Sequence, residues 1–448
     1  MTERWVPKVK VTTEKVAVHL KMGHALIRQR KYADALVEFQ KARALRPQLP
    51  LVHLFIGDVY LEQQRYADAI AEYEEALRQN PHNAAAHVKL GNAYYEQQRY
   101  PEAVTEYGAA LRQDPKLAVV HVKLGNVHLA QEQYAEATAA YETALRLNPQ
   151  LGGARLKLAR VHAAQHRPDD AAAQYETALR FDPKFALAHL MLGVLRADQE
   201  RYEDAVAAYR AALAINPKLA PAHAKLAEAF ERQGRYDDAV AAYEAALKAN
   251  PSLAAVQVKL GDLHAKHGQH DEAARAYATV LKANPDLARV QVRLGDAQLG
   301  QGRHADALAA YGAALKQKPD LLGAHLGLGD AHVARKEYGD AMKAYQSALK
   351  INPRSAVAHA KLGDVYFAQS ENGHALSAYR AAARLDPKLA RTHLGLGDVY
   401  AAQGQRAEAE AEYQAAALLD PELAAARVGP MEGDPTSIPS KGKRPASA

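Results

Sequence analysis

The stretch from Ala84 to Leu117, AAAHVKLGNAYYEQQRYPEAVTEYGAALRQDPKL, decides the fold because nearly the whole chain repeats it. A fixed period of this length is typical of a solenoid, in which each repeat is too small to bury its own apolar face and packs against its neighbours. The sequence therefore predicts one continuous array. Prolines mark the period every thirty-four residues without insertion, at positions 47, 81, 115, 149, 183, 217, 251, 285, 319, 353, 387 and 421.

Two helices are predicted inside each repeat. In the quoted stretch, apolar residues recur at helical spacing from 84 to about 96 and again from 100 to 112. Pro101 is tolerated because it falls in the first turn of the second helix. That helix ends at Asp114-Pro115, because the residue before a proline is pushed out of the α region. We name the two segments helix A and helix B.

Four positions keep their character throughout the array. The middle of helix A holds a glycine, replaced by Ala159 and Ala227 in two repeats. Helix B carries an early alanine, then Phe39 or a tyrosine, then a second alanine that is absent only at Val280. A glycine inside a helix costs about 1 kcal/mol relative to alanine. Its recurrence therefore indicates that helix B crosses close to helix A.

Period and residues together resemble the tetratricopeptide repeat (TPR) over residues 16–423. The resemblance implies an all-α fold, an α-solenoid in which twelve helix-turn-helix repeats form a right-handed superhelix with helix A lining the concave surface. One departure is that many such repeats carry tryptophan in the first turn of helix A, where nine of these carry histidine. The repeats are expected to begin at residues 16, 50, 84, 118, 152, 186, 220, 254, 288, 322, 356 and 390.

Short segments flank the array. Residues 1–15 are predicted to be an N-terminal extension, either a short cap over the first helix or a loose tail. Residues 424–448 are predicted to add a turn or two of helix before Gly429-Pro430, followed by a disordered tail rich in Pro, Ser, Gly and Lys. No apolar run is long enough for a signal peptide or a membrane span, so we expect a cytoplasmic protein.

The candidate binding site lies on helix A. The position two residues before the glycine is basic in eight repeats, and the position one residue after it is mostly Asp or Asn. These two rows are three residues apart, so their side chains can pair, and surface pairing alone would explain them. The basic row consists of Lys21, Lys89, Lys123, Lys157, Lys225, Lys259, Arg293 and Lys361.

The basic row meets fewer acids in the first five repeats than in the rest. We therefore expect an extended acidic peptide to bind along repeats three to five, contacting Lys89, Asn92, Lys123, Asn126 and Lys157. Replacing the three lysines with glutamate should weaken binding of the acidic peptide. Unchanged affinity in a titration would contradict this site.

The family also contains a two-carboxylate clamp that holds the acidic C-terminus of a chaperone. That clamp needs a lysine one residue before the basic row of this chain, and this position is apolar in every repeat, as at Val88, Val122 and Leu156. Asn92 and Asn126 do match clamp positions. The sequence favours instead a groove with an apolar floor and charged flanks, suited to an extended segment or an amphipathic helix.

Chemistry other than binding finds little support in the sequence. No Walker loop, nucleophile elbow or dinucleotide fingerprint is present, so neither an enzyme nor a cofactor is expected. The best metal candidate is His264 with His267 and His270. The nearest carboxylate, Asp271, already has a role at the start of helix B, so no metal is expected.

Two further partner classes are weaker alternatives to a protein or peptide. The net charge of +6 and pI of about 9.1 suggest nucleic acid as a partner. The excess of positive charge is small for 448 residues, however, and acidic residues interrupt the basic row. A homo-oligomer through the C-terminal end would follow if Tyr413 and Ala416 lacked a capping helix. We expect a non-catalytic protein-interaction scaffold.

Overall fold

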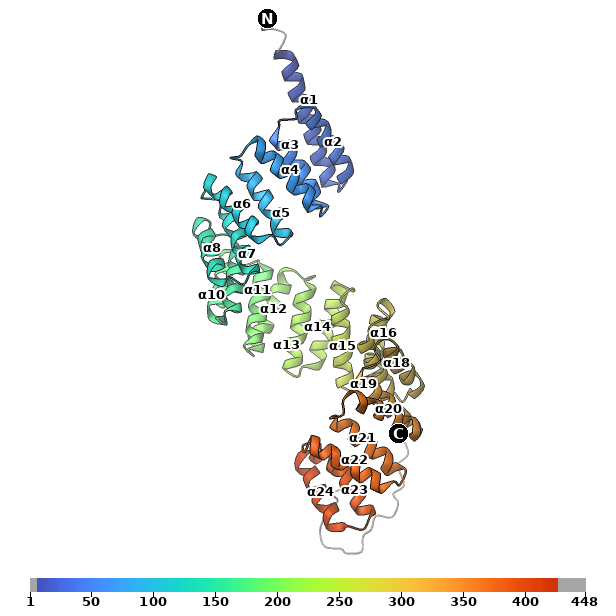
Figure 1. The fold of residues 1–448 in the computed structure, drawn as a ribbon. Coiled ribbons are helices and arrows are strands. Elements are labelled where there is room, and N and C mark those ends of the chain that lie inside the picture. The colour runs from blue at the N-terminus through green and yellow to red at the C-terminus, as the bar shows by residue number, and fades with distance from the viewer. Residues whose placement is uncertain (1–5, 426–448) are drawn as a thin grey trace. The chain divides into compact units, whose positions relative to one another are not determined.

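The computed structural model describes residues 6–425, which form twenty-five α-helices and, within that range, no strand. The helices fall into two compact units, and the boundary lies between Arg235 and Tyr236, in the turn that separates α13 from α14. Within each unit, every helix lies beside the next one along the chain (Figure 1). The predicted all-α class and the helix-turn-helix period are confirmed.

The odd-numbered helices up to α23 are helices A, and the even-numbered ones are helices B. Unit 1 contains α1 (Val6–Arg28), α2 (Tyr32–Leu45), α3 (Pro50–Glu62), α4 (Tyr66–Gln79), α5 (Ala84–Glu96), α6 (Tyr100–Gln113), α7 (Ala118–Ala130), α8 (Tyr134–Leu147), α9 (Gly152–Ala164), α10 (Pro168–Phe181), α11 (Ala186–Asp198), α12 (Tyr202–Ile215) and α13 (Ala220–Arg232). Unit 2 contains α14 (Tyr236–Ala249), α15 (Ala254–Lys266), α16 (His270–Ala283), α17 (Ala288–Gly300), α18 (His304–Gln317), α19 (Leu322–Ala334), α20 (Tyr338–Ile351), α21 (Ala356–Ala368), α22 (Asn372–Leu385), α23 (Ala390–Ala402), α24 (Arg406–Leu419) and α25 (Pro421–Ala424).

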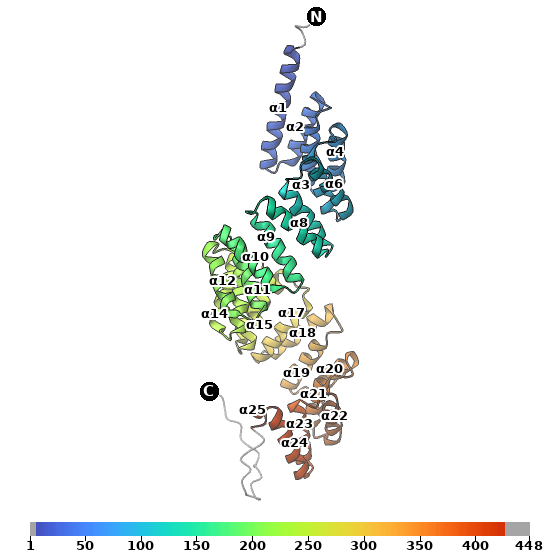
Figure 2. The ribbon, with the colours of Figure 1, turned by 90° about the vertical axis from the view of Figure 1, so that its left-hand side faces the viewer.

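The first helix differs from the expected repeat boundary. α1 begins at Val6 rather than at Val16, and it extends beyond α2 (Figure 2). Residues 6–15 therefore continue the first helix A. Residues 1–5, the rest of the predicted extension, lie outside the described residues.

Each repeat is held together where the helix B tyrosine packs against the helix A glycine. A Cβ atom added to Gly91 would lie only 2.6 Å from Cε1 of Tyr107. Tyr107 is 2% exposed, and Ala103, one turn earlier on the same helix, is fully buried. The glycine is needed because the aromatic ring occupies the space that a side chain would take. The same contact recurs in both units, for example between Gly295 and Tyr311.

A left-handed residue ends helix A and lets the chain reverse. Gln98 has φ +60° and Gly268 has φ +73°, and the equivalent residues of the other repeats described this way also have positive φ. Only glycine adopts this conformation without strain. Glycine occupies the position in four repeats, at 234, 268, 302 and 404.

The C-terminal end of the array is better covered than the sequence suggested. Ala416 is fully buried, so the expectation that it would lack packing partners was wrong. The short helix α25 follows α24 directly, and the Asp420 side chain caps it by accepting from the Leu423 N–H at 2.9 Å. Tyr413 is half-buried, unlike the fully buried tyrosines of inner repeats. The predicted tail after Gly429 lies outside the described residues.

Among residues 6–425, no helix combines the length and the apolar character needed to cross a lipid bilayer. The longest helix, α1, carries several charged side chains along its length.

Candidate functional site

The polar residue after each helix A glycine connects neighbouring elements. In α3 this residue is Asp58. The hydroxyl of Tyr73, from α4 of the same repeat, donates to Asp58 Oδ1 at 2.9 Å. Lys89, from α5 of the next repeat, places Nζ 2.7 Å from Oδ1 and 2.8 Å from Oδ2 of the same carboxylate. We name this arrangement of tyrosine, carboxylate and next-repeat cation a closed triad, because the chain itself neutralises the cation.

The basic row therefore does not follow one pairing rule. Lys225 bonds the acid three residues later, as predicted, with Nζ 2.7 Å from Glu228 Oε2. Lys89, Arg293 and Lys361 instead pair with the acid of the preceding repeat. For these three residues the predicted pairing within one helix was wrong. The reason is that neighbouring helices A lie side by side, so the basic position of one helix faces the acidic position of the helix before it.

Repeats three and four carry asparagine in place of the aspartate, and the next lysines consequently face an amide. In both cases the tyrosine hydroxyl donates to the asparagine Oδ1 at 2.9 Å. The two N–H bonds of each asparagine Nδ2 are then the part of the amide that can serve a ligand. In the described part of the chain, neither lysine amine is within ion-pairing distance of a carboxylate. These open triads are Tyr107–Asn92–Lys123 and Tyr141–Asn126–Lys157.

Burial without a counter-charge changes the acidity of both open-triad lysines. Desolvation lowers the pKa of Lys123 below its ordinary value, and the negative charge of Glu96 opposes this only in part. Desolvation also lowers the pKa of Lys157, and the positive charge of Arg160 adds to the effect. A carboxylate brought to either amine would supply the missing charge and would be bound more strongly than at a neutralised lysine.

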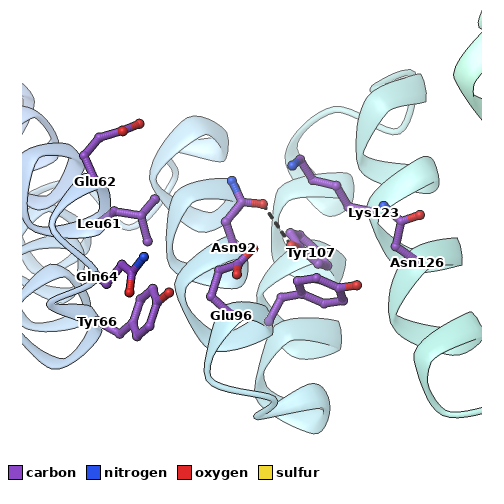
Figure 3. A pocket seen from close by; sticks show the side chains of 10 residues that line it. Leu61, Glu62, Gln64, Tyr66, Asn92, Glu96, Tyr107, Lys123 and Asn126 are labelled. Carbon is purple, nitrogen blue, oxygen red and sulfur yellow. Dashed lines mark hydrogen bonds between the residues drawn. The ribbon is translucent and has the colours of Figure 1, made fainter. Parts of the chain in front are cut away.

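Two neighbouring cavities of unit 1 expose these groups. The first has a volume of about 480 Å³, and Figure 3 shows Asn92, Lys123 and Asn126 on its wall. The second has a volume of about 370 Å³ and is lined by Asn126, Lys157 and Arg160. Tyr95 and Asn126 line both cavities. The structure thus brings together four of the five residues predicted to contact an acidic peptide: Asn92, Lys123, Asn126 and Lys157.

Acidic and aromatic side chains complete the lining. Glu62 and Glu96 lie in the first cavity and Glu132 in the second. Tyr66 also lines the first cavity, and Tyr134 the second. The cavities are therefore mixed in charge, with unneutralised cations next to carboxylates and tyrosine rings. Any anionic ligand must place its charge at the lysines and away from the glutamates.

A third cavity of unit 1 provides a useful comparison. It has a volume of about 290 Å³ and is lined by residues of repeats six and seven, among them Tyr202, Lys225 and Glu228. Here the lysine is already bonded to Glu228 on its own helix. The cavity repeats the geometry of the basic row without offering an unneutralised amine.

Unit 2 continues the row with closed triads. Asp262 accepts from Tyr277 and pairs with Arg293 at 2.7 Å. Asp330 accepts from Tyr345 and pairs with Lys361 at 2.7 Å from Oδ1. These cations are neutralised, and Lys259 occupies the same position on α15, exposed to solvent. The predicted basic residues of unit 2 therefore differ from the open-triad lysines in their environment.

Asp296 of unit 2 shows the opposite imbalance. It accepts a hydrogen bond from Tyr311 at 2.7 Å, but the position that would carry the next basic residue is Gly327. Desolvation raises the pKa of Asp296, and the nearby charge of Asp330 adds to the rise. The acidic row is thus less compensated here, in agreement with the charge asymmetry of the sequence.

The apolar row does not form the floor of these cavities. Leu156 is 8% exposed and belongs to a buried cluster with Ala159 and Ala171. Val88 and Val122 are half-buried and pack against core clusters that their own repeats share with neighbouring repeats. None of the three lines either cavity. Leu156 thus belongs to the core, whereas Val88 and Val122 keep part of their surface exposed outside these two cavities.

The histidines of helix A take structural roles. His87 bonds Glu106 of α6 at 2.6 Å through Nδ1, and its Nε2 lies 3.1 Å from the carbonyl oxygen of Pro81. Of the metal candidate, His264 bonds Gln269 and the hydroxyl of Tyr236. In the range that the structure describes, no three His, Cys, Asp or Glu side chains converge on a point where a metal ion would fit.

Sequence reasoning missed the tyrosines and glutamates of the cavities. A signal was present in α5, where Lys89, Asn92 and Glu96 follow the spacing i, i+3, i+7 and so lie on one helix face. Tyr95 precedes Glu96, and Tyr66 and Tyr134 each begin a helix B. Extending the two rows by one helical turn would have found Glu96.

Comparison with known proteins decides the family. Models of the tetratricopeptide repeat match residues 20–78, 56–118, 118–151, 156–220, 224–288, 292–356 and 390–423, and a TPR repeat model matches residues 363–404. This chain belongs to the tetratricopeptide repeat family. TPR architecture supports a protein-interaction scaffold, and the family is generally non-catalytic. No curated protein matches the chain.

Solved TPR structures resemble parts of the chain. A tetratricopeptide repeat protein from Parabacteroides merdae is 18% identical, with a TM-score of 0.48 over 53% of this chain and 95% of that one. Yeast Tom70 is 14% identical, with a TM-score of 0.37 over 92% and 99%. YrrB, a TPR protein with an unusual peptide-binding site, is 22% identical, with a TM-score of 0.34 over 44% and 97%.

Proposed function

We propose that this TPR protein is a non-catalytic scaffold that binds an acidic segment of a partner protein along repeats three to five. The observation that carries the proposal is the pair of open triads. Lys123 and Lys157 lie beside neighbouring cavities without a carboxylate partner, whereas Lys89 is neutralised by Asp58. A partner carboxylate would complete each open triad in the way that Asp58 completes the closed one.

Two further observations support an anionic ligand. The asparagine amides present N–H donors next to the lysines, so each cavity offers a charged and a neutral donor to a carboxylate. The lowered pKa of both lysines reflects an incomplete environment that a carboxylate would complete. The same groups are less suited to a cationic or purely apolar ligand. Lys89, which the sequence placed in this site, is left with a supporting role.

The proposal is tested by titrating the full chain with a fluorescent acidic peptide and measuring polarisation. We expect the double variant Lys123→Glu with Lys157→Glu to bind about tenfold more weakly or worse, because hydrogen bonds to charged groups contribute about 1.5–3 kcal/mol each. Binding should also weaken as salt increases, since the lysines are only half-buried. Equal affinity of wild type and double variant would refute the site.

Lys225→Glu is the matched control. Its lysine lies in a comparable cavity of the same unit but is already paired with Glu228. This variant changes the net charge in the same direction, by half as much as the double variant, so any loss of affinity that it shows reports general electrostatics. Circular dichroism of all variants confirms that the repeats remain folded.

A further inference from the structure

We infer that the acidic segment binds as a polyproline II helix with a carboxylate at every third residue and proline or another apolar residue between. This inference rests on the proposed function and specifies its ligand. Three features of the two cavities carry it: the spacing of the open-triad lysines, the tyrosines between them, and the glutamates beside them.

The spacing of the lysines follows from the stacking of helices A. Lys123 on α7 and Lys157 on α9 occupy the same position in successive repeats. Packed helices lie about 8–10 Å apart, and Cα atoms of α7 and α9 approach within 8 Å. In a polyproline II helix, residues i and i+3 lie on the same side about 9 Å apart. Same-side residues of a strand are separated by about 7 Å, which is too short.

The tyrosines fit the residues between the carboxylates. Tyr95 lines both cavities, and it is flanked by Tyr66 in the first and Tyr134 in the second. Grooves lined with aromatic rings dock polyproline II segments, because the extended helix presents apolar rings and loses little entropy on binding. All three tyrosines are half-buried, so part of each ring remains accessible.

The glutamates restrict where acidic residues can stand. Glu62 and Glu96 line the first cavity together with Lys123, and Glu132 lines the second together with Lys157. A continuous run of acidic residues would bring some carboxylates against these side chains, and like charges repel at short range. Isolated carboxylates separated by two uncharged residues reach the lysines and avoid the glutamates. A more acidic ligand is therefore not a better ligand for this site.

Three peptides of identical composition but different order test the inference against the full chain: one carries glutamate at every third position with prolines between, one carries glutamate at every second position, and one gathers the glutamates into a single run. A fourth peptide, in which helix-forming residues replace the prolines, spaces its glutamates by seven. We expect the every-third peptide to bind at least tenfold more tightly than the clustered one in fluorescence polarisation. Tighter binding of the clustered, alternating or helical peptide would overturn the inference.

A variant of the protein tests whether repulsion by the glutamates causes the expected difference in affinity between the peptides. Replacing Glu62, Glu96 and Glu132 with glutamine should strengthen binding of the clustered peptide severalfold and change that of the every-third peptide little. Equal affinity of all four peptides for the wild type would contradict the spacing while leaving the acidic-segment function intact. Failure of every acidic peptide to bind would contradict both proposals.

Discussion

One atom separates the residues that close a triad from those that leave it open. Asp58 and Asn92 occupy the same position in successive repeats, and each accepts from the tyrosine of its own helix B at 2.9 Å. They differ in the group that faces the next lysine. The aspartate neutralises Lys89, and the asparagine leaves Lys123 unpaired by any carboxylate among the described residues. The binding properties of the row are therefore set by side-chain chemistry at positions that hardly affect packing.

Asn92→Asp should close the first open triad. The new carboxylate is expected to pair with Lys123 as Asp58 pairs with Lys89, and the acidic peptide should then bind about tenfold more weakly, because the lysine already has a partner. A titration by fluorescence polarisation measures the change. Unfolding in urea should show that stability is retained. Undiminished affinity would mean that Lys123 does not carry the binding.

Gly91→Ala should destabilise the protein although alanine favours helices. The added Cβ would meet the Tyr107 ring at 2.6 Å, and overpacking of this kind costs about 1–3 kcal/mol. Gly108→Ala is the matched control, because only the Arg112 side chain lies near its Cβ position, at 3.8 Å. This second change should instead stabilise by up to about 1 kcal/mol. Urea unfolding of both variants measures the two changes in the free energy of unfolding, which should be opposite in sign. Equal changes would show that the close contact between Gly91 and Tyr107 is unimportant.

Helix pairs were the most predictable level of this structure. The phased prolines and glycines determined where all helices A after the first begin, because helix ends depend on local chemistry that the sequence displays. The start of α1 was not predictable from the repeat, since the residues before Val16 do not follow the repeat pattern. Which acidic residue each lysine pairs with was also not predictable, because the pairing depends on the offset between two neighbouring helices A.

The apolar row illustrates the same limit. Leu156 was expected on the open face from its place on helix A, yet it lies in the core with 8% exposure. A residue at the edge of a helical stripe can turn toward either side, and only the packing of helix B decides between them. Asn92, Lys123, Asn126 and Lys157 line two neighbouring cavities, but the glutamates and tyrosines beside them were not anticipated from the sequence.

The last helix pair contains a contact that should depend on pH. Burial lowers the pKa of His393, but hydrogen bonds to Glu412 at 2.6 Å and to the Pro387 carbonyl at 2.9 Å, together with the Glu412 charge, raise it overall. Because the folded state holds the proton more tightly, the stabilisation is complete below the ordinary pKa and is lost as pH rises through the raised value.

His393→Gln tests this dependence. The variant should be less stable than wild type at about pH 6, and the difference should shrink toward about pH 8.5, about two units above the ordinary pKa of histidine. Urea unfolding at both pH values gives the two differences. Glu412→Gln should remove the same dependence. A difference that stays constant across this range would show that the proton on His393 does not contribute.

At the scale of the whole chain, stability and binding should be separable because each repeat contacts mainly its neighbours. Removing residues 288–321, one complete repeat of unit 2, should lower the urea dependence of unfolding in proportion to the lost surface. The acidic peptide should bind this shortened chain as it binds wild type. Removing residues 118–151 deletes Lys123 and Asn126, leaves one lysine next to Asn92, and should therefore weaken binding about tenfold. Loss of binding in both deletions would show that the site needs the array as a whole.

The closed triad has a consequence for how such an array acquires new partners. Aspartate and asparagine are nearly isosteric, so exchanging one for the other changes which lysines can bind a ligand without disturbing the packing of the repeats. Asp58→Asn should free Lys89 from its ion pair and extend the binding site by one repeat toward the N-terminus. The reverse exchange, Asn126→Asp, should shorten the binding site by one repeat. Single substitutions that leave the fold unchanged would thus change the position of the binding site along the array.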